Sequence, residues 1–158
     1  MQNIRTGKDL LFKHLSEIAL GFLIVISIAA NITWIRADNR LGPEIDSKVY
    51  LSKTLVFMDQ MENGSQNSFF ENLQELSHGG RPPLYQLLSI PFIALLGRSM
   101  DSGLMLNLVF QVLLLVSIFN IGKLLGNQKA GLLAAVLITA YPPMIQLSRI
   151  FRPNFALT

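Results

Sequence analysis

The sequence predicts an all-α, polytopic membrane protein with about three transmembrane helices and short interfacial helices in its first outer loop. Of its 158 residues, 51% are hydrophobic and only 15% are charged, and the mean hydropathy is +0.43. This charge content is low for a soluble domain, in which about a quarter of the residues are charged. Three long apolar runs, separated by short polar segments, give the predicted spans.

The first apolar run, residues 15–35, is long enough to cross a bilayer once. At about 1.5 Å per residue, a helix of this length covers roughly 30 Å, the thickness of the hydrocarbon core. Trp34 lies near the end of the run, where an amphipathic ring suits the interface. A cleaved signal peptide is the alternative, because basic residues precede the run and small residues lie within it. The length of the run and the apolar segments after it favour a span.

Two further runs, residues 104–125 and 130–147, are also long enough to span, the latter only just. Between the first and second runs lies a shorter apolar segment, residues 84–97, which contains Pro91. As a helix it covers only about 20 Å. We therefore expect it to lie in or dip into the interface, beginning after a Pro-Pro pair and ending at Gly97.

The distribution of Lys and Arg predicts the orientation of the chain in the membrane. With the amino terminus inside, residues 1–14 and 122–129 are cytoplasmic and hold 5 basic residues in 22. The outer segments, residues 36–103 and 148–158, hold 8 in 79. If residues 84–97 also spanned, the cytoplasmic segments would hold 6 basic residues in 31 and the outer segments 7 in 54, which is a smaller difference in density. The positive-inside rule thus favours a multi-pass protein of the cell membrane, with a cytoplasmic amino terminus and its large loop outside.

Composition also excludes several classes of function. The sequence has no Cys, which removes disulfides, thiolate nucleophiles and Cys-based metal sites. No basic run is interleaved with aromatic residues, so we expect no nucleic acid partner.

Two carboxylates open the predicted outer loop in the stretch PEIDSKVY, residues 43–50. Glu44 and Asp46 are two residues apart, so they would point the same way on an extended loop and would diverge on a helix. In a loop they could share a divalent cation, or one could accept a proton while the other orients it. The alternative is a pair of solvated loop acids. His78 is a further candidate metal ligand, but no cluster at fixed spacing requires a metal cofactor.

Basic and amide side chains mark other positions near the predicted outer face. Arg81 precedes the Pro-Pro pair, where a guanidinium suits a phosphate group, and Arg149 and Arg152 follow the third run. The alternative for all three is contact with lipid headgroups. Asn107 and Gln111 are four residues apart on the second run and are expected to join it to a neighbouring helix.

The order of these features resembles the amino-terminal part of membrane glycosyltransferases that use polyprenyl-phosphate sugars. These form the protein O-mannosyltransferase and lipid A aminoarabinose transferase superfamily, which has the GT-C fold. An acidic motif opens the first outer loop there, and Asp46 and Tyr50 match its Asp and Tyr, whereas Ser47 stands where Glu is usual. Later matches are RPPLYQLLSIPFIALLG, beginning at Arg81, and GLLAAVLITAYPP. In SRIFRPNFALT, Asn154 stands where the superfamily has Asp.

The resemblance covers about residues 15–158 and implies an activity. It implies transfer of a sugar from a polyprenyl-phosphate donor to a lipid, glycan or protein acceptor at the outer membrane face, with inversion. Asp46 would be the general base, Glu44 a helper or metal ligand, and Tyr50 the third member of the catalytic set. Arginines would bind the donor phosphate: Arg81, with Arg149 and Arg152 as further candidates.

Two other hypotheses stand beside this one. A non-catalytic polytopic protein could bind lipid phosphate through Arg81, in which case Glu44 and Asp46 would be dispensable. The chain could also be an inactive truncated fragment. Members of the superfamily carry more spans than this chain, so the resemblance implies a fragment of a longer protein.

Overall fold

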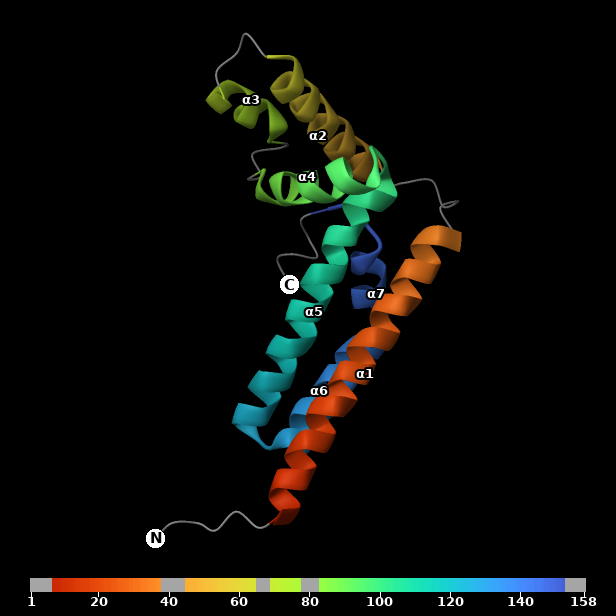
Figure 1. Ribbon diagram of the computed structural model, residues 1–158, viewed down its shortest axis with the longest axis vertical. Helices are drawn as coiled ribbons and strands as arrows, with labels where there is room; N and C mark the ends of the chain where they lie inside the picture. The colour runs from red at the N-terminus through yellow and green to blue at the C-terminus, as the bar shows by residue number, and fades with distance from the viewer. Residues whose placement is uncertain (1–6, 38–44, 65–68, 78–82, 153–158) are drawn as a thin grey trace.

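The computed structural model describes residues 7–37, 45–64, 69–77 and 83–152, with side chains from residue 14 onward. Within these ranges it contains seven α-helices and no strand, which confirms the predicted all-α class (Figure 1). The helices are α1 (Gly7–Ala37), α2 (Ile45–Asn63), α3 (Phe69–Leu76), α4 (Leu84–Leu96), α5 (Met100–Leu125), α6 (Gln128–Ala140) and α7 (Pro142–Ser148).

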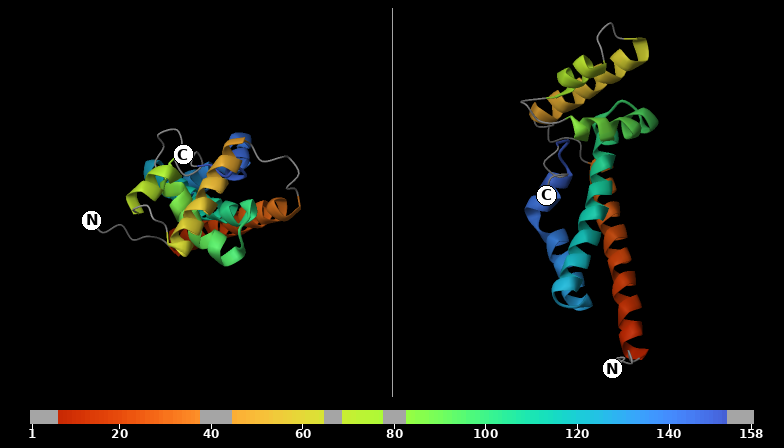
Figure 2. Two further views of the ribbon diagram at one scale, coloured as in Figure 1. Left: turned by 90° about the horizontal axis from the view of Figure 1, so that it is seen from above. Right: turned by 90° about the vertical axis from the view of Figure 1, so that its left-hand side faces the viewer.

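The helices form an elongated bundle with a cap at one end. The long helices α1 and α5 run along the bundle, with α6 and α7 beside them (Figures 1 and 2). Helices α2, α3 and α4 gather at one end, called here the α2–α4 end. His14–Ala37 of α1 and Met100–Leu125 of α5 are long and apolar enough to cross a membrane. Helices α6 and α7 together form a candidate broken span.

The second predicted span is part of a longer helix, because α5 begins at Met100 rather than at residue 104. Ser99 caps this start: its side chain accepts a hydrogen bond from the backbone nitrogen of Ser102 at 3.2 Å. Asp101 lies in the first turn, where a carboxylate interacts favourably with the positive end of the helix dipole. These polar residues begin the helix outside the apolar run, so hydropathy alone places the start too late.

The third predicted span is interrupted within its apolar run. Helices α6 and α7 meet at Tyr141 with a bend of 66°. Pro142 and Pro143 explain the break, because proline lacks a backbone N–H and disfavours helical geometry in the residue before it. Tyr141 is accordingly extended, with φ −76° and ψ 113°. Pro142 then begins α7, a position at which proline is favourable.

Helix α4 agrees with the short apolar segment expected between the first two spans. It ends at Leu96, before Gly97, whose positive φ of 106° disfavours residues with a side chain. Its 13 residues cover about 20 Å, too short for a comfortable span. In Figure 1 it lies across the top of α5 rather than along it, as expected for a helix in the interface.

Helices α5 and α6 form a close hairpin. Asn127 caps α6 by accepting a hydrogen bond from the backbone nitrogen of Ala130 at 3.0 Å. Glycines then allow the two backbones to approach: a Cβ on Gly122 would lie only 2.7 Å from the Cα of Gly131. In membranes there is little hydrophobic driving force between helices, so close packing relies on small residues at the helix crossings.

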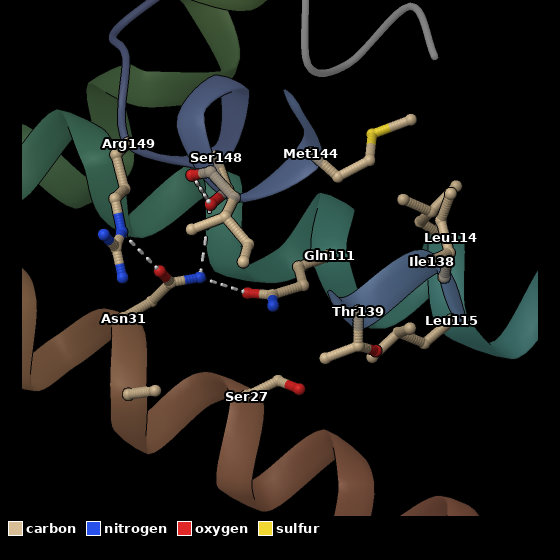
Figure 3. Close-up of a pocket in the computed structure, with 12 residues that line it drawn as sticks. Ser27, Asn31, Gln111, Leu114, Leu115, Ile138, Thr139, Met144, Ser148 and Arg149 are labelled. Carbon is tan, nitrogen blue, oxygen red and sulfur yellow. Dashed lines mark hydrogen bonds between the residues drawn. The ribbon is translucent and has the colours of Figure 1, made fainter. Parts of the chain in front are cut away.

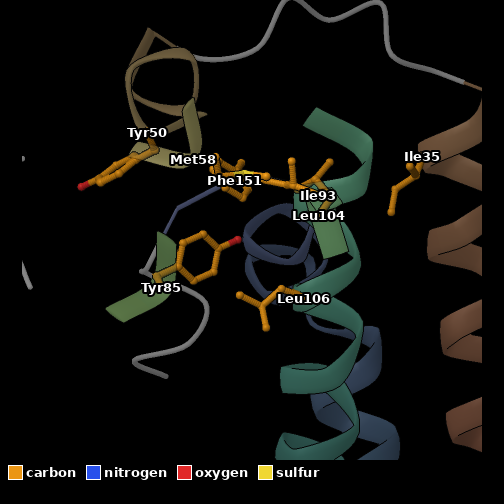
Figure 4. Packing of buried hydrophobic residues seen from close by; sticks show 8 residues of the cluster. All are labelled: Ile35, Tyr50, Met58, Tyr85, Ile93, Leu104, Leu106 and Phe151. Atoms are coloured by element: carbon orange, nitrogen blue, oxygen red, sulfur yellow. The ribbon is translucent and has the colours of Figure 1, made fainter. Parts of the chain in front are cut away.

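Two groups of buried apolar residues hold the bundle together. One lies between α1, α5 and α6 and comprises Leu20, Leu115, Phe119 and Ala135. The other lies at the α2–α4 end and comprises Ile35, Tyr50, Met58, Tyr85, Ile93, Leu104, Leu106 and Phe151 (Figure 4). Many large apolar side chains of α1, Phe22 among them, are exposed instead. Such exposure is expected of a helix that faces lipid, because the bilayer solvates apolar groups.

Candidate active site

Asp46 and Arg152 form an ion pair at the α2–α4 end. Asp46 lies in the first turn of α2, where the helix dipole favours a carboxylate, and Arg152 follows α7. The acid is 39% exposed and the arginine 20%. Asp46 is therefore helical and not part of an extended loop, so the expectation of a loop at this position is wrong. The pair combines a solvent-accessible carboxylate with a mostly buried guanidinium.

Tyr50 lies one helical turn after Asp46 and points into the core. Residues four apart share a helix face, so the acidic motif places both side chains on the same side of α2. Tyr50 is only 1% exposed and packs in the group that includes Tyr85 and Phe151 (Figure 4). It therefore anchors the start of α2 beneath the carboxylate.

A buried network of hydrogen bonds positions the segment that carries Arg152. The hydroxyl of Tyr85 donates to Oδ1 of Asn107 at 2.8 Å. Nδ2 of Asn107 donates to the carbonyls of Ser148 and Ile150, both at 3.0 Å. Burial raises the pKa of Tyr85 well above its usual range, so this hydroxyl stays protonated and remains a donor. The expectation that Asn107 joins its helix to neighbours is confirmed.

Phe151 packs the segment that carries Arg152 against α5. Its ring centroid lies 5.2 Å from that of Tyr85, and its ring covers Gly103 so closely that a Cβ there would overlap it. Phe151 is 1% exposed. The neighbouring Arg152 is thus held by a residue fixed on two sides.

Charged residues of α2 also contact Arg98 and the end of α3. Arg98, between α4 and α5, pairs with Asp59 and with Glu62, the latter at 2.7 Å. Hydrogen bonds to these two carboxylates raise the pKa of Arg98. On α2 itself, Nζ of Lys53 donates to the carbonyls of Glu75 at 2.9 Å and Ser77 at 2.5 Å, which caps the end of α3.

Arg149 faces a different helix from Arg152. Its Nε donates to Oδ1 of Asn31 on α1 at 3.2 Å, and its guanidinium lies 4.8 Å from the ring centroid of Trp34. Nδ2 of Asn31 donates in turn to Oε1 of Gln111 at 2.7 Å, which confirms the expected role of Gln111 in joining helices. The two arginines near the end of α7 therefore contact different helices: Arg152 pairs with α2, and Arg149 bonds to α1 (Figure 3).

The comparisons with known proteins identify the family of the chain. A family model described as dolichyl-phosphate-mannose-protein mannosyltransferase matches residues 80–158, the carboxy-terminal half. The chain belongs to this family. No curated protein and no solved structure gave a match. The family is one of membrane glycosyltransferases of the GT-C type, so the resemblance seen in the motifs is confirmed.

The part that matches the mannosyltransferase family includes α4, α5, α6 and α7 and both Arg149 and Arg152. Asp46 and Tyr50 precede it. The ion pair between Asp46 and Arg152 thus joins the family-matched half to the acidic motif at the start of α2.

Several predicted site residues lie outside the described part of the chain: Glu44, His78, Arg81 and Asn154. Among the described residues, no group of three or more His, Asp or Glu side chains could hold a metal ion.

Sequence reasoning missed Asn31, although polar residues inside an apolar span are a known sign of internal contacts. Asn31 and Ser27 are four residues apart on the first run. That spacing places them on one helix face and could have indicated that this face turns toward the protein.

Proposed function

We propose that this chain takes part in transfer of a sugar from a polyprenyl-phosphate donor to a hydroxyl group of a lipid, glycan or protein acceptor. Membership of the mannosyltransferase family supports the reaction class. The ion pair between Asp46 and Arg152 is the observation that supports this location for the chemistry. It unites a proton acceptor and a phosphate-binding group at one end of an apolar bundle.

In the proposed reaction, Asp46 acts as the general base. The acceptor oxygen bonds to the anomeric carbon from the side opposite the phosphate, and the proton of its hydroxyl passes to the Asp46 carboxylate. The bond between the anomeric carbon and the phosphate oxygen breaks, and its electron pair leaves with the phosphate. This single displacement inverts the anomeric centre. With 39% exposure, the Asp46 side chain is accessible to an acceptor.

Arginines would stabilise the charge that develops on the departing phosphate. Arg81 is the proposed principal contact, from the motif that the resemblance supplies. Arg152 is a second, because it already lies beside the proposed base. In a poorly solvated site, a fixed guanidinium stabilises an oxyanion more strongly than it does in water. We further propose that a bound donor phosphate shares Arg152 with Asp46.

Tyr50 and Glu44 have supporting roles in this proposal. The burial of Tyr50 suits a positioning role, in which the ring fixes the start of α2. Glu44 would assist Asp46. The alternative role of Glu44 is that of a ligand to a divalent cation, since magnesium is commonly held by one or two carboxylates together with water and substrate phosphates.

We propose that the α2–α4 end faces the outside of the cell membrane, with the amino terminus in the cytoplasm. The absence of cysteine allows a direct test, because single cysteines can be introduced without background. Asn63→Cys at the end of α2 should react with an impermeant maleimide applied to intact cells. Lys129→Cys, near the start of α6, should react only after permeabilisation. The reverse pattern would contradict the orientation.

Replacing the proposed base tests the reaction. Asp46→Asn should abolish sugar transfer in the full-length protein while membrane insertion is retained. Asp59→Asn is the matched control, since Asp59 is also an exposed acid of α2 but pairs with Arg98. Full activity in Asp46→Asn would instead favour the non-catalytic, lipid-phosphate-binding hypothesis.

A further inference from the structure

A pocket lies between α2 and α3, at the end of the molecule away from the long helices. Its volume is about 190 Å³. A cavity needs only roughly 10–15 Å³ to hold one water molecule, so this pocket is large enough for a ring-sized ligand. In Figures 1 and 2, α4 lies between these two helices and the bundle. This separation from the apolar helices favours a water-soluble ligand over a lipid chain.

The buried part of the pocket lining is apolar and aromatic. Phe57 and Leu76 line the pocket and are only 5% and 1% exposed. Phe69 packs edge-on against Phe57, with 6.2 Å between the ring centroids, and is 50% exposed. The rings of Phe57 and Phe69 therefore offer an apolar surface to one face of a ligand.

Polar groups with unused hydrogen-bonding capacity lie around this apolar surface. Nε2 of Gln60 donates to Oε2 of Glu75 at 3.3 Å, and both residues line the pocket. Oε1 of each has no partner among the described residues, so the pocket offers two acceptor oxygens. Nζ of Lys53 donates to two carbonyls and has a third N–H. A ligand that both donates and accepts hydrogen bonds suits this arrangement.

The charges in the pocket favour a neutral ligand. Lys53 and Glu75 carry opposite charges and both line the pocket. An anion would be repelled by the carboxylate and a cation by the ammonium group, so neither sign of charge is selected. Saccharide hydroxyls are neutral, and each can donate and accept a hydrogen bond. The C–H groups of a sugar ring also present an apolar face. A saccharide therefore matches the charge, the polar groups and the aromatic surface together.

Helical spacing places this pocket in line with the proposed base. Lys53 and Gln60 follow Asp46 by seven and fourteen residues, about two and four turns, so all three lie near one face of α2. At helical rise they are about 10 and 21 Å from Asp46 along the helix. A ligand that reaches both Asp46 and the pocket must therefore be longer than one sugar ring.

We propose that the pocket between α2 and α3 binds a neutral saccharide unit of the acceptor. Hydroxyls of the saccharide donate to Gln60 and Glu75 and accept from Lys53, and its ring lies against Phe57 and Phe69. The role as acceptor rests on the proposed function, in which the acceptor is a lipid, a glycan or a protein. The pocket selects a glycan among these three.

Saturation-transfer NMR on the full chain in phosphatidylcholine nanodiscs tests this binding, because nanodiscs contain no sugar-based detergent. The probes are four neutral trisaccharides: maltotriose, cellotriose, mannotriose and triacetylchitotriose. At least one should bind. Cationic chitotriose and anionic trigalacturonic acid should bind no better than the neutral probe, since each brings a charge that one side chain of the pocket repels.

Two variants locate the binding in this pocket. Glu75→Gln should weaken binding of the neutral probe by about tenfold or more, because a hydrogen bond to a charged group is lost. Val56→Trp should abolish binding by filling the pocket, which Val56 lines with 52% of its surface exposed. Glu71→Gln and Met61→Trp are the matched controls, since Glu71 is another exposed acid of α3 and Met61 another exposed apolar residue of α2, both outside the pocket. Both controls should bind as the parent chain does.

Three outcomes would overturn the proposal. They are no binding of any neutral trisaccharide, unchanged binding in Glu75→Gln and Val56→Trp, and tighter binding of an uncharged hexapeptide of Ser, Thr and Gly, which would assign the pocket to a protein. Binding requires neither donor nor transfer, so Asp46→Asn should retain it. Retained binding without any sugar transfer by the parent chain would contradict the proposed function alone, whereas lost binding with retained transfer would contradict this inference alone.

Discussion

Arg152, which follows α7, donates a hydrogen bond to Asp46 in the first turn of α2, although 106 positions separate the two residues along the chain. The pair joins a segment of the family-matched half to an acid that precedes it. Phe151 and the network around Asn107 fix the backbone on the arginine side, and Tyr50 fixes it on the acid side. The geometry of the proposed base is therefore set by packing on both sides.

Removing the cation of this pair should affect the donor more than the stability. Arg152→Ala should raise the KM for the donor by about tenfold or more, the cost of a lost charge-assisted contact with phosphate. The ion pair is partly exposed, with the Asp46 side chain 39% and the Arg152 side chain 20% accessible, so its loss should change the free energy of unfolding by only about 1 kcal/mol. Initial rates at varied donor concentration, with a thermal melt in detergent, measure both quantities.

Arg98→Ala is the control for that change, because Arg98 also bridges acids of α2 but lies away from Asp46. Its KM for the donor should match the parent value. An unchanged KM in Arg152→Ala would show that Arg152 does not contact the donor phosphate.

Replacing Asn107 should destabilise the fold strongly. Asn107→Leu removes three hydrogen bonds: it leaves the Tyr85 hydroxyl and the Ser148 carbonyl without the bond to Asn107, while the Ile150 carbonyl still accepts from the backbone nitrogen of Arg152. Each unsatisfied buried group costs about 1–3 kcal/mol, so a loss of several kcal/mol is expected. Tyr85→Phe removes one of the three bonds and should cost about 1 kcal/mol. Equal unfolding midpoints for the two variants would contradict the central role of Asn107.

The sequence predicted the helical class and α4 because these depend on local patterns. Apolar runs of bilayer length identify α1 and α5, and the glycine after residue 96 ends α4. The start of α5 was placed late, because the Ser99 cap lies among polar residues that hydropathy does not score. The break at Tyr141 was missed, although the two prolines that cause it were visible.

The candidate site was only partly predictable, because its geometry depends on contacts between distant segments. The motif identified Asp46 and Tyr50, but nothing local showed that Arg152 would reach Asp46 while Arg149 turns to α1. Only Ile150 and Phe151 lie between those arginines, and both arginines follow the last helical residue of α7, so helical spacing does not predict their directions. Hydropathy also did not reveal the buried hydroxyl of Ser27, because one hydroxyl scarcely alters the mean hydropathy of an apolar run.

The exposed contacts of Arg98 should make the position of α2 sensitive to salt but not to pH near neutrality. Its carboxylate partners raise the pKa of Arg98, and a raised pKa means that the stabilisation is complete below the unfolded pKa of arginine, which lies far above neutrality, and is lost only at higher pH. Arg98 therefore contributes equally from pH 6 to 9. At 1 M salt the screening length falls to about 3 Å, which weakens exposed pairs.

Limited proteolysis after Lys53 and Lys48 in α2 measures this effect. Cleavage should be faster in 1 M NaCl than in 0.1 M NaCl for the parent chain. Arg98→Ala should cleave faster at low salt and respond less to added salt. A parent chain whose cleavage rate does not depend on salt would contradict a role for Arg98 in holding α2.

Adding a side chain at Gly131 should separate α5 from α6. A Cβ there would overlap the backbone oxygen of Phe119 and lie 3.1 Å from the backbone nitrogen of Lys123, so the helices must move apart. Backbone atoms cannot rotate away as a flexible side chain can. Gly131→Ala should therefore lower the free energy of unfolding by about 1–3 kcal/mol, the usual cost of overpacking, and Gly131→Val by more. Unfolding midpoints in detergent, followed by circular dichroism, measure the loss.

Gly21→Ala is the matched control for this prediction, because Gly21 is also a helical glycine but a Cβ there meets no atom within 4 Å. Alanine favours the helix over glycine by up to about 1 kcal/mol, so this variant should be as stable as the parent or slightly more so. If both alanine variants unfolded at the same point, contact between α5 and α6 at Gly131 would not limit stability. A loss confined to Gly131 would instead show that the close crossing holds α6, and with it the α7 segment that carries Arg149 and Arg152, against the bundle.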